Sequence, residues 1–218
     1  DEQELDEEQE RVDEQEPEDE QERVEEQERV EEHEPEDEPE EVQGTGAQLD
    51  KLASEASEPL TDHQIDSLLA DLPGYLGTIC KDEIPKLTEA MKKAWDSGIP
   101  FGFITLNIDR NLATGNSRRP PEVGHWVAVA VIPDTQQVTY SDSFGLPAPA
   151  DIKASLKKAL DHVAPKTLLK SKENLIQHQS VNTNNCGWFC IKFILEMVHG
   201  RSFADVTGYN AMASQVAK

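Results

Sequence analysis

The chain contains 218 residues and carries a formal net charge of −24, which is distributed unevenly. Residues 1–43 contain 25 acidic and 3 basic residues, whereas the remaining 175 residues contain 19 acidic and 17 basic ones. No run of 18 apolar residues is present, so no membrane span is expected. No secretory signal is expected either, because no basic segment precedes an apolar one.

The acidic segment is repetitive. The sequence Gln-Glu-Arg-Val occurs three times in it, and the block 9–20 returns with few changes as 27–38. Such a charge, with so few apolar residues, predicts a disordered tail over 1–46 and a globular domain over 47–218. The tail could also imitate nucleic acid or mask a basic surface, but its charge argues against binding nucleic acid itself. Because the first residue is Asp1 rather than Met, we expect a fragment or a processed product.

The spacing of apolar residues in the globular part predicts its helices and strands. In chain order, we expect a helix over 62–71 capped by Thr61, a helix over 83–97, a strand over 101–108, an exposed loop over 111–124, a hairpin of strands over 126–132 and 137–142, a helix over 151–163, a short strand over 175–179, and helices over 186–199 and 203–216. The strands are concentrated in the middle. The expected fold class is therefore α+β, with a small mixed central sheet flanked by helices.

The three cysteines do not form a disulfide framework, so a reducing, intracellular compartment is expected. Cys186 follows a polar turn and begins an apolar helix, where the helix macrodipole favours a thiolate. The alternative is a buried core residue, which is the main expectation for Cys80 and Cys190. Zinc is a further alternative, for which His178 and His199 would join the two helical cysteines. The spacing does not match the common zinc motifs, so no metal or other cofactor is expected.

A nucleophilic thiol needs a base, a group that orients this base, and donors for the oxyanion. His125 directly precedes one strand of the hairpin and Asp142 ends the other, so their side chains can meet. Gln179 lies seven residues before Cys186, where its amide could bind a developing oxyanion. Gly187 would allow a substrate backbone to approach closely.

These residues together resemble the adenain-like (adenoviral-type) cysteine proteases of Polinton-type elements and related DNA viruses, and more distantly the SUMO-specific proteases. The resemblance covers about residues 58–200 and follows the family order of His, Asp or Glu, Gln, and Cys-Gly. The motifs that carry it are His125-Trp126, Asp142 within Tyr-Ser-Asp-Ser-Phe-Gly-Leu-Pro, Gln179, and Asn185-Cys186-Gly187-Trp188-Phe189-Cys190.

The resemblance implies a role for each matching residue. Cys186, at the start of a buried helix, would be the nucleophile, His125 the base, and Asp142 the group that orients it. Gln179 and the backbone N–H of Cys186 would form the oxyanion hole. Trp126 would pack under the cleft on the His125 side and, like Gly187, would contact substrate.

The expected function is that of a thiol endopeptidase that processes viral or virus-like structural precursors, in the virion or in the host nucleus or cytoplasm. Its partners would be protein or peptide substrates, with capsid precursors first among them. The adenoviral enzyme uses DNA and a capsid-derived peptide as activators, so a peptide activator is also a candidate partner here. The alternatives are a deSUMOylating or ubiquitin-like isopeptidase, and an inactive binding module with an acidic interaction tail.

The junction between the tail and the globular part contains Val-Gln-Gly-Thr-Gly at 42–46. Adenoviral-type proteases prefer an aliphatic residue, any residue, Gly and any residue before a cut that precedes Gly. The junction fits this pattern except that Val replaces the larger Met, Leu or Ile, and it predicts self-cleavage between Thr45 and Gly46. An ordinary glycine-rich hinge is the alternative.

Overall fold

The structure is a computed structural model that describes residues 58–113 and 124–209. The expected boundary between the acidic tail and the globular part lies outside the described residues, as does the expected cleavage position at Thr45 and Gly46. Within the described ranges, no helix combines the length and the apolar character needed to cross a membrane.

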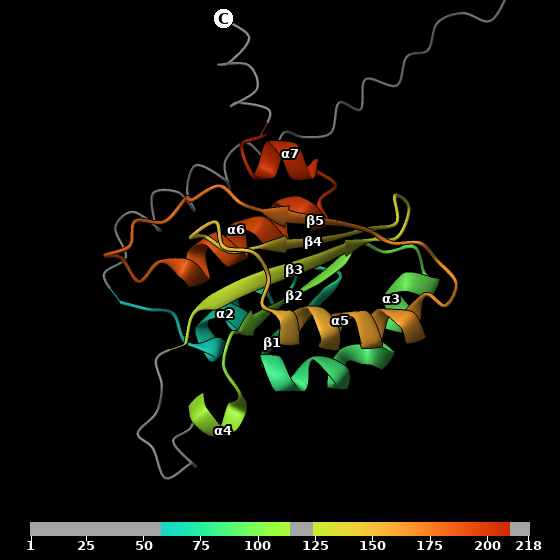
Figure 1. Cartoon of the computed structure of the whole chain (residues 1–218), viewed down its shortest axis with the longest axis horizontal. Coiled ribbons are helices and arrows are strands. Elements are labelled where there is room, and N and C mark those ends of the chain that lie inside the picture. The colour runs from blue at the N-terminus through green and yellow to red at the C-terminus, as the bar shows by residue number, and fades with distance from the viewer. Residues whose placement is uncertain (1–57, 114–123, 210–218) are drawn as a thin grey trace, which may run out of the picture. The chain divides into compact units, whose positions relative to one another are not determined.

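A five-stranded mixed sheet lies at the centre of the described residues (Figure 1). Neighbouring strands in the sheet follow chain order: β1 (Tyr75–Cys80), β2 (Phe101–Leu106), β3 (Trp126–Ile132), β4 (Gln137–Ser141) and β5 (Lys170–Asn174). β2, β3 and β4 are antiparallel, whereas β1 and β5 each pair in parallel at the two edges. The expected α+β class with a mixed central sheet is confirmed.

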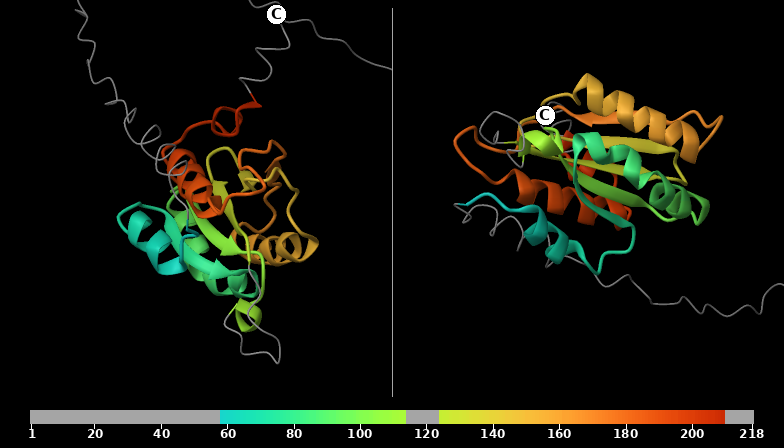
Figure 2. Two further views of the ribbon diagram at one scale, coloured as in Figure 1. Left: turned by 90° about the vertical axis from the view of Figure 1, so that its left-hand side faces the viewer. Right: turned by 90° about the horizontal axis from the view of Figure 1, so that it is seen from below.

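Helices cover both faces of this sheet (Figure 2). The helices of the described residues are α2 (Asp62–Leu69), the 3₁₀ helix η1 (Lys81–Leu87), α3 (Thr88–Asp96), α4 (Arg110–Ala113), α5 (Ala150–Val163), α6 (Cys186–Val198) and α7 (Phe203–Val206), of which α4 lies away from the sheet (Figure 1). The apolar side chains of α3 and α5 pack on one face of the sheet, and those of α2 and α6 pack on the other.

The alternation of side chains along β3 divides the core into two clusters. Val127, Val129 and Val131 point to the α3 and α5 face, whereas Ala128 and Ala130 point to the α6 face. All five are fully buried. The larger valines fill the space under two helices, and the small alanines let the single helix α6 lie close to the strand.

Gly102 in β2 extends this close approach to the neighbouring strand. A Cβ atom placed at Gly102 would lie 2.6 Å from Cδ1 of Ile194 in α6 and 2.8 Å from the carbonyl oxygen of Val129. Both distances are shorter than any ordinary van der Waals contact. The glycine is therefore needed for α6 to rest on the middle of the sheet.

This packing predicts that Gly102→Ala destabilises the protein. The clash should cost about 1–3 kcal/mol, which exceeds the roughly 0.5–1 kcal/mol that alanine gains over glycine within a strand. Urea unfolding measures the difference. Ile194→Val removes the clashing Cδ1, so the double variant should lose less stability than the sum of the two single variants. Strict additivity would contradict the assigned contact.

The two edge strands differ from what the sequence predicts. β1 is absent from the expected elements because it contains Gly77, has no long apolar run and is only partly buried. The prediction of a strand over 175–179 is wrong, because the strand in this region is β5, which covers the five residues directly before it. Lys170, Ser171 and Lys172 in β5 are exposed, and an edge strand of polar residues gives no apolar signal.

The main helices agree with the sequence predictions to within one or two residues. Those expected over 62–71, 151–163 and 186–199 are confirmed as α2, α5 and α6, and Thr61 caps α2 by accepting a hydrogen bond from the N–H of Gln64 at 3.3 Å. The helix expected over 83–97 is instead divided into η1 and α3. Pro85 lies within η1 and cannot donate a backbone hydrogen bond. The helix expected from residue 203 is, among the described residues, only the short α7.

Candidate active site

The β3–β4 hairpin brings His125 and Asp142 together. His125 directly precedes β3 and Asp142 directly follows β4, and the pairing of Ala128 with Ser141 places both at the same end of the hairpin. Nε2 of His125 donates a hydrogen bond to Oδ1 of Asp142 at 2.8 Å. The contact that the hairpin predicts is therefore present.

Asn107, which directly follows β2, holds the backbone of His125. Its side-chain Oδ1 accepts a hydrogen bond from the N–H of His125 at 2.9 Å, and its own N–H donates to the carbonyl oxygen of His125 at 3.1 Å. These two bonds extend the β2–β3 pairing by one residue beyond the strands. The position of the imidazole thus depends on two neighbouring strands.

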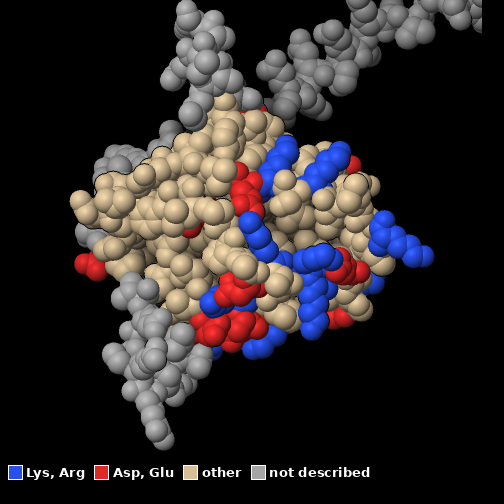
Figure 3. Space-filling view, viewed as in Figure 1, with Lys and Arg blue, Asp and Glu red and all other residues tan. Residues whose placement is uncertain are grey.

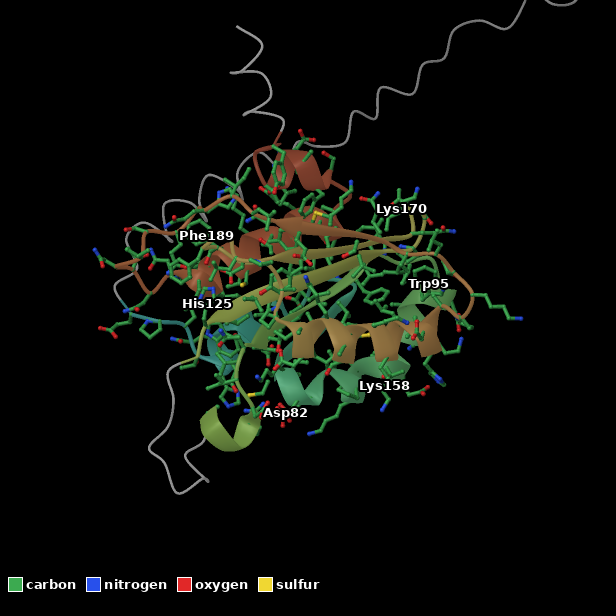
Figure 4. The ribbon with its side chains drawn as sticks, in the orientation of Figure 1. Asp82, Trp95, His125, Lys158, Lys170 and Phe189 are labelled. Carbon is green, nitrogen blue, oxygen red and sulfur yellow. The ribbon has the colours of Figure 1, made fainter. Side chains whose placement is uncertain are left out.

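Cys186 is the first residue of α6 and lies against His125. The Cys186 side chain lies close enough to the imidazole to raise the pKa of that ring, and the residue is 8% exposed. Because Nε2 of His125 is held by Asp142, Nδ1 is the ring nitrogen left to face the thiol. The helix N-terminus also favours negative charge near its first residues. In Figure 4, His125 lies at the same end of the sheet as Phe189, in the first turn of α6.

The surroundings of His125 favour its charged form. Burial lowers the pKa of the imidazole, but the hydrogen bond to Asp142 and the neighbouring Cys186 side chain outweigh burial and raise the pKa from 6.5 to about 9. His125 is therefore an imidazolium at neutral pH. A cation beside a thiol at a helix N-terminus is the arrangement that stabilises a nucleophilic thiolate.

Gln179 is buried, at 2% exposure, and both ends of its amide are held. Nε2 donates to the carbonyl oxygen of Thr183 at 2.7 Å, and Oε1 accepts a hydrogen bond from the hydroxyl of Ser143 at 2.6 Å. Because the Thr183 carbonyl can only accept, these two partners define which side of the amide is nitrogen. Thr183 lies three residues before Cys186, so Gln179 connects the end of β4 to the turn before α6.

Phe144, for which the sequence predicts no role, lies next to the imidazole of His125. Its ring stacks on the ring of His125, with centroids 4.7 Å apart and an interplanar angle of 26°. Its N–H donates to Oδ1 of Asp142 at 2.7 Å. The sequence does not predict the contacts that Asn107, Ser143 and Phe144 make with His125, Asp142 and Gln179. Ser143 and Phe144 nevertheless lie inside a motif that carries the family resemblance.

Trp126 and Gly187, both expected to contact substrate, each lie next to Leu60. The indole N–H of Trp126 donates to the carbonyl oxygen of Leu60 at 2.9 Å, and Trp126 also lines a cavity of about 290 Å³. Gly187 is buried, and a Cβ atom there would lie 3.1 Å from Cβ of Leu60. The missing side chain of Gly187 therefore makes room for Leu60, and its expected contact with substrate stays a prediction.

The other two cysteines lie in apolar surroundings. Burial raises the pKa of the Cys190 thiol well above its ordinary value, and burial also raises the pKa of Cys80 although nearby Arg110 lowers it. Neither thiol is therefore activated. Both agree with the packing role expected from the sequence.

The structure does not bring the four candidate zinc ligands together. Among the described residues, the one cluster of three or more side chains with suitable geometry is Cys80, Asp82 and Glu83. Arg110 occupies this cluster, since its guanidinium donates to Oε2 of Glu83 at 2.8 Å and its N–H donates to Asp82 at 3.0 Å. A bound arginine opposes a metal cation there.

Two described loops beside the site contain no Asp, Glu, Lys or Arg. These are the segments 143–149, after Asp142, and 175–185, before α6. In Figure 3, lysine and arginine side chains gather over α5 and β5, whereas the surface toward the start of α6 is largely uncharged. Ion pairs with these loops therefore contribute nothing to recognition at the site.

No protein-family model and no curated protein sequence matches the chain. Solved structures do match. Two crystal structures of the ASFV pS273R protease align with TM-scores of 0.50 and 0.51, at 17% and 14% identity, over 70% of this chain and 62% of that protein. ChlaDub1 from Chlamydia trachomatis aligns with a TM-score of 0.45 at 18% identity, over 70% of this chain and 84% of that one.

The two matches with TM-scores of 0.50 and 0.51 show the fold of the chain. Over the aligned residues it is the fold of the ASFV pS273R protease, a protease fold as the sequence resemblance predicts. The chain spans 62% of the length of the ASFV protease, so that protein contains further segments without a counterpart in the alignment.

The hydrogen bond between His125 and Asp142 predicts a specific titration. In the wild-type protein, imidazole NMR signals should show His125 losing its proton near pH 9, so the ring stays charged at pH 8. Asp142→Asn removes the anionic acceptor while burial remains, so the pKa of His125 should fall below its wild-type value. An unchanged pKa in Asp142→Asn would contradict the assigned cause.

Proposed function

We propose that the chain is a cysteine-type hydrolase that cleaves peptide bonds, with Cys186 as the nucleophile. The observation that carries the proposal is the imidazole of His125, held between Asp142 and Cys186 at the first residue of α6. The fold of a viral protease supports the same chemistry. The alignment with that protease indicates the fold, so the activity rests on the geometry of these side chains.

The proposed reaction follows from the positions of these groups. The Cys186 thiolate attacks the carbonyl carbon of the scissile bond, and the electron pair of the carbonyl moves onto its oxygen. The second Nε2 hydrogen of Gln179 and the backbone N–H of Cys186 stabilise this oxyanion. The intermediate collapses to a thioester as the departing amine takes the proton of His125. Neutral His125 then removes a proton from water, and the water oxygen attacks the thioester carbonyl. Collapse of this second intermediate releases the acid product and the Cys186 thiolate beside protonated His125.

We further propose that the substrates are structural precursors of a virus or virus-like particle. The sequence resemblance to adenain-like proteases supports this class of substrate. The uncharged loops 143–149 and 175–185 favour an uncharged, extended stretch of polypeptide at the site. Cleavage at the C-terminus of a folded ubiquitin-like domain would use the same four side chains of the candidate site. Experiment therefore has to distinguish this substrate from a structural precursor.

The proposal predicts that peptide cleavage requires Cys186 but not Cys190. Cys186→Ala and His125→Ala should each abolish cleavage of a capsid-precursor peptide, and Gln179→Ala should lower kcat on the order of 10²–10³-fold because one oxyanion donor is lost. Cys190→Ala is the matched control, since it removes a buried thiol one turn further along α6 and should retain activity. A panel that includes a folded ubiquitin-like fusion distinguishes an endopeptidase from an isopeptidase. Full activity in Cys186→Ala would refute the mechanism.

Self-cleavage gives an independent prediction from the sequence at 42–46. The active enzyme should cut between Thr45 and Gly46, because small residues beside the scissile bond pass easily through a narrow cleft. Intact-mass measurement after incubation should reveal a new N-terminus at Gly46, and Cys186→Ala should remain uncut. An intact tail in an enzyme that cleaves other peptides would contradict the prediction.

A further inference from the structure

The turn after β4 contacts several parts of the candidate site through consecutive residues. Asp142 accepts the hydrogen bond from His125, Phe144 stacks on the same imidazole, and Ser143 holds the amide of Gln179. Asp142 and Ser143 are 4% and 3% exposed, so these contacts lie within the protein rather than on its surface. A short turn thus contacts both the base and the proposed oxyanion donor.

Phe144 restrains the His125 ring in two ways. Its own ring lies nearly parallel to the imidazole, which limits rotation of the imidazole out of its plane. Its N–H donates at 2.7 Å to Oδ1 of Asp142, the same oxygen that receives Nε2 of His125 at 2.8 Å. The carboxylate is therefore fixed by the backbone of the residue whose side chain covers the imidazole.

Ser143 restrains Gln179 through both its side chain and its backbone. Its hydroxyl donates to Oε1 of Gln179 at 2.6 Å, and its carbonyl oxygen accepts the N–H groups of His178 and Gln179 at 2.8 and 2.9 Å. Without the hydroxyl, Oε1 would lose this partner in a buried position. The orientation of the amide would then depend on Thr183 alone.

The turn itself is held in place from both sides. Gly145 has a φ of +71°, and a Cβ atom there would lie 2.8 Å from the carbonyl carbon of Ile176, so only glycine fits this close approach. Nδ2 of Asn174 donates to the carbonyl oxygens of Asp142 and Ile176 at 3.2 and 3.1 Å. The turn therefore has little freedom to move relative to the loop that carries Gln179.

We propose that Ser143 and Phe144 are positioning residues of the hydrolase. Phe144 sets the plane of the His125 ring, and Ser143 sets the orientation of the Gln179 amide, so that one turn aligns the base and the oxyanion donor together. The inference rests on the proposed function, because it assigns supports to the groups that would carry out the reaction. Neither residue contacts the reacting atoms in this scheme.

Phe144→Leu tests the first half, since leucine keeps apolar bulk but removes the ring. The imidazole should then be held less well, so kcat should fall about tenfold at unchanged KM. The alkaline limb of activity should also move to lower pH, because weaker hydrogen bonds lower the pKa of His125 from about 9. Phe144→Tyr keeps the ring and should restore both values. A lower melting temperature with unchanged kcat and pH profile would overturn the assignment.

Phe189→Leu is the matched control for this change. Phe189 lies on α6 beside a different histidine, His178, at a centroid distance of 6.3 Å. The same substitution there should leave the alkaline limb in place. A shift as large as that of Phe144→Leu would mean that general loosening of the fold causes the effect, and would also overturn the assignment.

A double-mutant cycle tests the second half. Ser143→Ala should lower kcat in the wild-type background but have no further effect in the Gln179→Ala background, because the serine acts only through that amide. Alkylation of Cys186 by iodoacetamide should remain at the wild-type rate in Ser143→Ala, since the thiol and His125 are untouched. Equal kcat losses in both backgrounds would overturn the role of Ser143.

The alkylation assay also separates failure of this inference from failure of the proposed function. The pH dependence of Cys186 alkylation needs no peptide substrate. If His125→Ala leaves that dependence unchanged, the thiol is not activated by the imidazole, and the proposed function fails. If His125→Ala moves the alkylation profile to higher pH but Phe144→Leu leaves the profile in place, the function stands and the positioning role of Phe144 fails.

Discussion

The packing of α6 on the sheet is the constraint on which the candidate site depends. α6 carries Cys186 at its first residue, and its position is set by the small side chains at Gly102, Ala128 and Ala130. A larger residue at any of these positions would lift the helix and separate the thiol from His125, which is fixed to β2 and β3. The alternation of large and small residues in the strands therefore determines how close the Cys186 thiol lies to the His125 imidazole.

The electrostatics of the site are a competition between burial and hydrogen bonding. Burial alone would favour a neutral imidazole, yet the partners of His125 raise its pKa to about 9. The net change from 6.5 corresponds to about 3 kcal/mol in favour of the charged ring. A nearly buried carboxylate, which is 4% exposed at Asp142, is tolerated because the imidazolium and the N–H of Phe144 both donate to it.

The sequence predicts those features that depend on local pattern. The hairpin turn at 133–136 places His125 opposite Asp142, and the polar turn before an apolar helix places Cys186 at its first residue. The sequence does not predict the edge strand β5, because a strand can pair at a sheet edge without an apolar pattern. The contact between Gly187 and Leu60 is not predicted because it depends on how the segment before α2 lies on α6, which no local pattern encodes.

The supporting residues are hard to recognise for the same reason, since their roles arise from contacts between distant segments. Asn174 and Gln179 are fully or almost fully buried, although asparagine and glutamine are usually exposed. Each is hydrogen-bonded to the turn after β4, and a satisfied polar network in a low-dielectric interior favours one geometry over its alternatives. An apolar residue at Asn174 or Ser143 would fill the same space without fixing an orientation. Buried polar residues at this turn are therefore explained by the alignment of His125 and Gln179 rather than by packing alone.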